Sequence, residues 1–261
     1  MYDANVHSDP IKVFWMPGCS SCVKVKEFLT GLGVPYESIN VLDDAKGMTD
    51  LTSMGAQSVP VVSRGKDFVF AQNLDQVASF VGMERGKVAD RLPPDVLIGR
   101  WLEFLATAKS MIAEIPGDRL EYRPIPNRPR RTMRELAYHI FQIPEVFLGN
   151  VAGEFEDWAH YINLPPPDDI LTFADILDYA DKIEPKLANW WKDLGDKSCE
   201  WPVKTYYGVR PGAELLERQT WHSAQHTRQL QVVLEGLGVP LSRKVSPDAY
   251  AGLPMPEGIW E

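Results

Sequence analysis

The stretch MPGCSSC, residues 16–22, places two cysteines where a β-branched run, IKVFW at residues 11–15, gives way to helical periodicity over residues 22–32. A thiol at this junction lies at the N-terminus of the helix, where unpaired amides and the helix dipole lower its pKa. The thiolate is the reactive form of cysteine. We therefore predict that Cys19 is a catalytic nucleophile and that Cys22, one turn into the helix, is the resolving thiol.

The chain around this motif alternates between strand-like and helical patterns. After the first strand and helix come a strand-like run at 35–41, a weaker helix at 44–54, strands at 59–63 and 67–71 with Gly65 at the turn between them, and a helix from Leu74 to Val81. The order β-α-β-α-β-β-α predicts an α/β domain: one small open sheet with helices on its faces.

Composition restricts the class of protein. The 261 residues are 44% hydrophobic and 24% charged, which suits one large or two ordinary globular domains. The formal net charge of −9 argues against a nucleic-acid partner. The chain has neither an apolar run long enough to span a bilayer nor a leader pattern at its start, so we expect no membrane association and a cytoplasmic location. Three cysteines do not form a disulfide framework.

Long helical patterns replace the short elements after residue 83. Residues 84–94 are charged, end in prolines and are the best linker candidate. Four amphipathic helices are predicted at about 97–115, 132–151, 173–194 and 213–235. Helices with connected apolar faces predict an all-α, up-down four-helix bundle. The predicted domains are therefore 1–83, a linker at 84–94, and 95–261, with a tail from residue 241 that wraps onto the bundle.

Three histidines form a candidate metal site in this bundle. His222 and His226, in QTWHSAQHTRQLQ at residues 219–231, lie four apart and so share one helix face. His139, in ELAYHIFQI at residues 135–143, lies on the apolar face of the second helix. Each histidine alone could be a core or rim residue with ordinary hydrogen bonds. Taken together they predict convergence on a divalent cation, because a shared ion satisfies three buried imidazoles.

Three neutral ligands leave an open coordination position, as in catalytic zinc sites. A thiol entering that position would lose its proton and become a nucleophile at neutral pH. Zinc is the first choice on this chemistry, with iron or nickel as alternatives, because imidazole suits all three.

With its two cysteines the first segment resembles the glutaredoxin family, a branch of the thioredoxin fold, over about residues 11–82. SVP at residues 58–60 stands where that family has Thr-Val-Pro. The resemblance implies a cis bond before Pro60, pairing of the Val59 backbone with a bound thiol, and a role for Asp75 in holding the carboxylate of glutathione. A lone Cys-x-x-Cys could instead be half of a zinc site or inert.

The helical region resembles the DinB-like superfamily over about residues 95–237. Members have four-helix bundles with one histidine on the second helix and His-x-x-x-His on the fourth, which RRTMRELAYHI at 130–140 and WHSAQHTRQLQ at 221–231 match. The resemblance implies a metal site at His139, His222 and His226. It also implies a transferase or isomerase that uses a low-molecular-weight thiol as cosubstrate.

Three hypotheses for the whole protein follow. In the first, the bundle uses a metal and a small thiol such as glutathione on a small electrophilic or disulfide substrate, and the Cys-x-x-Cys exchanges thiols. In the second, the protein is a thiol-disulfide oxidoreductase whose bundle recognises a partner. In the third, it is a redox or metal sensor. Residues that could bind a carboxylate or line the entrance to the bundle site are Arg119, Arg123, Arg128, Arg130, Arg131, Arg134, Tyr206, Tyr207 and Arg210.

Overall fold

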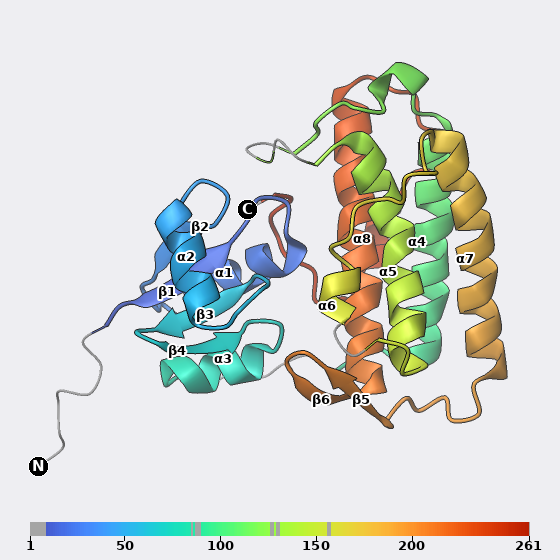
Figure 1. The fold of residues 1–261 in the computed structure, drawn as a ribbon. Coiled ribbons are helices and arrows are strands. Elements are labelled where there is room, and N and C mark those ends of the chain that lie inside the picture. Colours follow the sequence, from blue (N-terminus) through green and yellow to red (C-terminus); the bar gives the residue numbers. More distant parts are fainter. Residues whose placement is uncertain are drawn as a thin grey trace, which may run out of the picture. The chain divides into compact units, whose positions relative to one another are not determined.

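The computed structural model describes residues 9–84, 86, 90–125, 128, 131–155 and 158–260. The chain divides into two compact units. Unit 1 contains Met1–Val88, Ile125–Arg128 and Pro256–Glu261, and unit 2 contains Ala89–Pro124 and Pro129–Met255. Figure 1 labels the helices and strands of both units.

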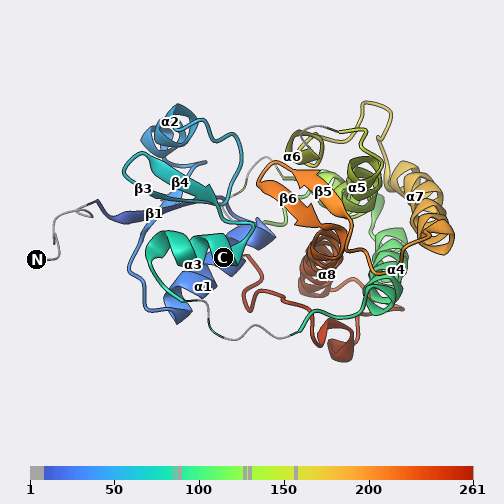
Figure 2. The ribbon, with the colours of Figure 1, turned by 90° about the horizontal axis from the view of Figure 1, so that it is seen from below.

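Unit 1 is a sheet covered by helices on both faces. Within its described part, four strands pair in the order β2-β1-β3-β4, namely β1 (Ile11–Trp15), β2 (Glu37–Asn40), β3 (Val61–Arg64) and β4 (Asp67–Phe70). The pair β1–β2 is parallel, whereas β1–β3 and β3–β4 are antiparallel. Figure 2 shows α2 (Ala45–Ser53) on one face of the sheet and α1 (Ser20–Gly31) and α3 (Leu74–Val81) on the other. The predicted thioredoxin-like order is confirmed.

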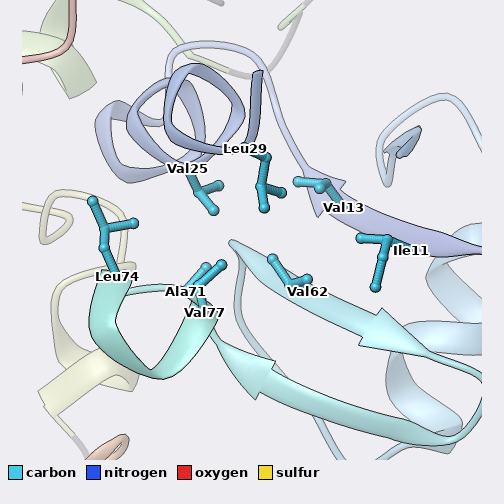
Figure 3. Packing of buried hydrophobic residues seen from close by; sticks show 8 residues of the cluster. All are labelled: Ile11, Val13, Val25, Leu29, Val62, Ala71, Leu74 and Val77. Carbon is cyan, nitrogen blue, oxygen red and sulfur yellow. The ribbon is translucent and has the colours of Figure 1, made fainter. Parts of the chain in front are cut away.

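The two faces of this sheet have separate apolar cores because successive strand residues point to opposite sides. Val13 and Val62 pack against Val25 and Leu29 of α1 and against α3 (Figure 3). The core on the α2 face is made of Phe14, Val41, Leu51, Ala56 and Val61. Both cores hold β1 in the middle of the sheet, and the Cys-x-x-Cys loop follows directly from this strand.

Unit 2 is a four-helix bundle, as predicted. Among its described residues the four long helices are α4 (Pro94–Ala113), α5 (Met133–Val151), α7 (Phe173–Asp193) and α8 (Gly212–Gly236). The helices α4 and α5 each pack mainly against α7 and α8. Figure 1 shows that α4 and α8 run in one direction and α5 and α7 in the other. The expected up-down alternation therefore holds for the pairs α4–α5 and α7–α8, whereas α5 and α7 are parallel.

The helix boundaries follow from local chemistry. Thr132 and Glu135 form the predicted capping box at the start of α5. Thr172 and Asp175 form a second one at the start of α7. Pro144 lies inside α5 and is buried, yet this helix continues past it to Val151.

The described connections include a short helix and a hairpin that the sequence patterns did not predict. The helix is α6 (Trp158–Tyr161). The hairpin consists of β5 (Pro202–Thr205) and β6 (Gly208–Pro211), and its turn uses Gly208 at a φ of 114°. Both occupy loops whose short apolar runs carry no clear periodicity.

The tail is divided between the units. Val245, Ala249 and Leu253 are buried, and Arg100 of α4 donates to the carbonyl of Ala249 at 3.2 Å, so the tail up to Met255 covers the bundle as expected. Residues 256–260 instead group with unit 1, and the predicted range 95–261 therefore does not coincide with unit 2. No described helix is both long and apolar enough to cross a membrane.

Candidate functional sites

The Cys-x-x-Cys motif lies at the N-terminus of α1. Cys19 is the N-cap residue, and its sulfur accepts a hydrogen bond from the backbone amide of Cys22 at 3.3 Å. The two cysteines are joined as a disulfide, with their Cα atoms 5.2 Å apart. Cys19 is half-buried, whereas Cys22 is only 1% exposed. Cys19 is therefore the more accessible of the two cysteines and Cys22 the sheltered one.

The register of the sheet brings the segment before β3 to the same edge as the cysteine loop. Phe14 pairs with Val61 across β1 and β3, so the residue before Val61 lies at the end of β1 from which the loop departs. The peptide bond between Val59 and Pro60 is cis, as the resemblance implied. Asp75 is exposed in the first turn of α3.

The three predicted histidines come together in the bundle. His139 of α5 and His222 and His226 of α8 each offer a ring nitrogen, and these atoms all lie within 4.8 Å of one another. The Nε2 atoms of His222 and His226 are 3.1 Å apart. His139 and His226 are buried, and His222 is half-buried.

The tautomer of His139 follows from its neighbours. Gln142 donates both protons of its Nε2 to backbone carbonyls, those of Tyr161 and Leu164, each at 3.0 Å. Its Oε1 must then face the Nδ1 of His139, at 2.8 Å. Because this oxygen can only accept, Nδ1 carries the proton and Nε2 presents a lone pair.

Two further glutamines repeat the arrangement on α8. The Nδ1 of His226 lies 2.7 Å from Oε1 of Gln229, and the Nδ1 of His222 lies 3.4 Å from Oε1 of Gln219. With both Nδ1 atoms donating to these oxygens, the two Nε2 lone pairs face each other. Two facing acceptors repel each other unless a proton or a cation lies between them.

Burial keeps two of the histidines neutral. It is the main cause of a pKa well below 6.5 for both His139 and His222. The guanidinium of Arg131 adds to the lowering in both cases, and that of Arg218 adds to it for His222. Protonation of His222 is therefore unfavourable, so a proton does not readily remove the repulsion between the two Nε2 lone pairs.

The donor set fits a divalent cation. Neutral imidazoles with their second nitrogens occupied are the form in which histidine ligates a metal. Tetrahedral Zn–N bonds of about 2.0–2.1 Å place ligand atoms about 3.3 Å apart, close to the separation of the two Nε2 atoms on α8. The three histidines could hold a metal after a small approach of His139.

Comparison with known proteins shows which family unit 1 is similar to. Residues 11–69 match the sequence model of the glutaredoxin family. Unit 1 is a glutaredoxin-like domain. An uncharacterised glutaredoxin-like 8.6 kDa protein encoded in the rubredoxin operon of Clostridium pasteurianum is 29% identical over 72 residues, which are 27% of this chain and 96% of that protein. The gene 56 proteins of the mycobacterium phages L5 and D29 are 35% and 33% identical over 54 residues, 20% of this chain in each case. The chain spans only 52% and 60% of their lengths.

Among solved structures, the chain is similar to YfiT from Bacillus subtilis, which is described as a probable metal-dependent hydrolase with an unusual four-helix bundle topology. The identity is 14%, the TM-score is 0.45, and the match covers 60% of this chain and 96% of that one.

The predicted arginines do not gather at one site. Arg210 forms a bidentate pair with Glu214, and Arg134 donates to the carbonyl of Ile170. Arg128 donates to a backbone carbonyl of the glutaredoxin-like domain. Arg119 pairs with its neighbour Asp118, Arg123 is exposed, and Arg130 lies outside the described residues. Arg131 is the member of this group that acts on the histidines.

The glutamines beside the histidines were missed from the sequence, although a signal for them exists. They stand three positions from their partners in the segments HIFQ, QTWH and HTRQ, at residues 139–142, 219–222 and 226–229. Residues three apart on a helix are neighbours, so this spacing lets each amide reach the adjacent ring.

Proposed function

We propose that the bundle is the catalytic unit of a metal-dependent enzyme that uses a low-molecular-weight thiol, and that the glutaredoxin-like domain performs thiol-disulfide exchange for it. The observation that carries the proposal is the convergence of three imidazoles whose Nδ1 atoms are each held by a glutamine. A transferase or an isomerase acting on a small electrophile is the class of reaction that we favour, with glutathione or a similar compound as the thiol.

Residues of the bundle would hold the cation and orient its ligands. His139, His222 and His226 would hold the cation through Nε2, with zinc as the first choice and iron or nickel as alternatives. A bound divalent cation supplies charge that lowers the pKa of a thiol or water in its open position. Gln142 fixes the ring of His139, because two carbonyls fix the amide.

The redox step belongs to the cysteines. The thiolate of Cys19 attacks a disulfide formed by the small thiol, releases one thiolate and retains the other half as a mixed disulfide. The thiolate of Cys22 then attacks the Cys19 sulfur, releases the second thiolate and leaves the Cys19–Cys22 disulfide seen in the structure. Two equivalents of an external thiol restore the dithiol.

The metal content of the full-length protein, purified without a chelator or a histidine tag, tests the proposal. We expect about one equivalent per chain in the wild type and none in a His222→Ala/His226→Ala variant. The His160→Ala variant is the control, because His160 is exposed and lies outside the three-histidine cluster. Wild-type protein that is folded, metal-free and unable to take up zinc, iron or nickel contradicts the proposal.

A second candidate function is that of a thiol-disulfide oxidoreductase whose bundle recognises a partner or senses redox state or metal. It is favoured by the glutaredoxin-like domain, whose cysteine pair needs no metal for exchange. The two proposals differ in whether the histidines are needed for turnover.

A further inference from the structure

The Pro17–Gly18 peptide unit, which ends one residue before Cys19, is held on both sides by segments distant in the sequence. The carbonyl of Pro17 accepts a hydrogen bond from Nη1 of Arg128 at 3.1 Å. The amide of Gly18, which belongs to the same peptide unit, donates to the carbonyl of Trp260 at 3.1 Å. All four residues belong to unit 1. This peptide plane cannot rotate without losing both hydrogen bonds.

The turn is also enclosed sterically. Gly18 has a φ of 73°, a left-handed conformation that suits glycine. A Cβ at this position would lie 2.7 Å from the side chain of Ile125, which is itself 3% exposed. The next residue in the chain is Cys19, whose amide donates to the carbonyl of Met16 at 3.3 Å and closes the turn.

A second anchor holds the segment that carries Trp260. The carboxylate of Glu27 on α1 accepts from the amides of Glu257 and Gly258 at 3.0 and 2.7 Å. We call residues 256–260 the strap. Gly18 and Glu27 are nine positions apart, and the chain between them is helical from Ser20 onward, which gives a separation of about 12–14 Å. Two to three extended residues of the strap span about 7–10 Å between its anchors. With the reach of the Glu27 side chain added, the strap lies along α1 and runs antiparallel to it.

We propose that the strap and Arg128 are positioning elements for Cys19, and that they favour the Cys19–Cys22 disulfide over the dithiol. A disulfide within a loop forms more readily when the two sulfurs are already held close together, because the effective concentration of one thiol at the other is higher. With the Pro17–Gly18 peptide plane fixed, the turn that leads into Cys19 keeps its sulfur beside the N-terminal turn that contains Cys22. A turn freed from the strap spends part of its time with the sulfurs apart. This inference concerns the thiol site and does not depend on the metal.

The redox equilibrium of the full chain tests the inference. Protein disulfide plus reduced dithiothreitol gives protein dithiol plus oxidised dithiothreitol, and its equilibrium constant is read by alkylating free thiols over a series of reagent ratios. Cys199 is buried and common to all variants, so it adds a constant background. We expect removal of residues 256–261 to shift the constant about threefold to tenfold toward the dithiol, the range set by one or two neutral hydrogen bonds.

Point variants distinguish an effect of the strap from a non-specific effect of shortening the chain. Glu27→Ala releases the strap without shortening the chain and should reproduce the shift, but it should add nothing in the truncated protein. Glu37→Ala removes the same charge from an exposed position on β2 and should leave the constant unchanged. An unchanged constant after truncation, or a shift toward the disulfide, overturns the proposal. If Glu27→Ala shifts the equilibrium constant as much in the truncated protein as in the full chain, Glu27 does not act through the strap.

Discussion

At the scale of single residues, the tautomer of each histidine in the cluster depends on the group that accepts a hydrogen bond from its Nδ1. Gln229 accepts from Nδ1 of His226 at 2.7 Å, so the lone pair of this ring is on Nε2. Glutamine is a neutral acceptor, and its loss frees the ring to rotate or to change tautomer. Groups of this kind commonly contribute 10–100-fold to metal affinity.

We predict that Gln229→Leu lowers zinc affinity by about 10–100-fold, whereas Gln229→Glu retains it, because a carboxylate oxygen accepts the same proton. Competition with a chromophoric chelator measures both constants. Gln231→Leu is the matched control, because Gln231 lies two positions along α8 and its oxygen accepts from the amide of Val245 instead. Equal affinities for wild type and Gln229→Leu contradict the role assigned to this amide.

The lowered pKa values of His139 and His222 predict the pH dependence of the metal-free protein. Below about pH 6.5 the unfolded chain binds a proton on each ring, whereas the folded chain does not until the pH is much lower. Stability is therefore fully present above that pH and falls as the solution becomes more acidic, by at most about 1.4 kcal/mol per pH unit for each histidine.

Urea unfolding of the metal-free protein at pH 7.5 and 5.5 measures this dependence. The free energy of unfolding should be lower at pH 5.5, and His160→Ala should show the same fall as the wild type, because the exposed ring of His160 is not one of the two responsible groups. A free energy of unfolding that does not decrease over this range is the opposing result.

At the scale of elements, one buried hydrogen bond joins the first and last helices of the bundle. The indole Nε1 of Trp101 on α4 donates to Oγ of Ser223 on α8 at 2.8 Å, and both side chains are fully buried. Ser223 adjoins His222, so this bond helps to set the position of the helix that carries His222 and His226. Ser223→Ala leaves the indole proton without its acceptor.

We predict that Ser223→Ala lowers the free energy of unfolding by about 1–3 kcal/mol, the usual cost of an unpaired buried donor. Ser110→Ala, which removes a hydroxyl from the far part of α4, should change it by less than about 0.5 kcal/mol. Urea unfolding followed by tryptophan fluorescence distinguishes them. Similar small effects for both variants contradict the importance of the α4–α8 bond.

At the scale of the whole molecule, a variant that inactivates one site should leave the activity of the other site intact. On the function that we propose, His139→Ala abolishes metal-dependent consumption of thiol by electrophiles and retains reduction of a small mixed disulfide. Cys19→Ser abolishes that reduction and retains one equivalent of metal. Assays of both activities and of metal content in the same full-length variants provide the measurement. If His139→Ala retains every activity that the wild type has, the oxidoreductase with a recognition bundle is the better description.

The sequence by itself determined the elements and much of the chemistry. Strand and helix periodicities, the capping box at Thr132, and the cysteines at the start of α1 are all encoded within a few positions of the chain. For the same reason, the pairing of His222 with His226 could be predicted from one helix turn. Helical hydrogen bonds and side-chain alternation involve residues a few positions apart, so they leave patterns that can be read in the sequence.

Only the tertiary structure decided which distant groups meet. It placed His139 beside α8, oriented Gln142 through two loop carbonyls, and made α5 and α7 parallel. It also brought Arg128 and Trp260 to a single peptide unit before Cys19, more than one hundred residues away. Contacts of this kind depend on how whole helices pack and on where irregular segments return, and neither leaves a periodic signal in the residues themselves.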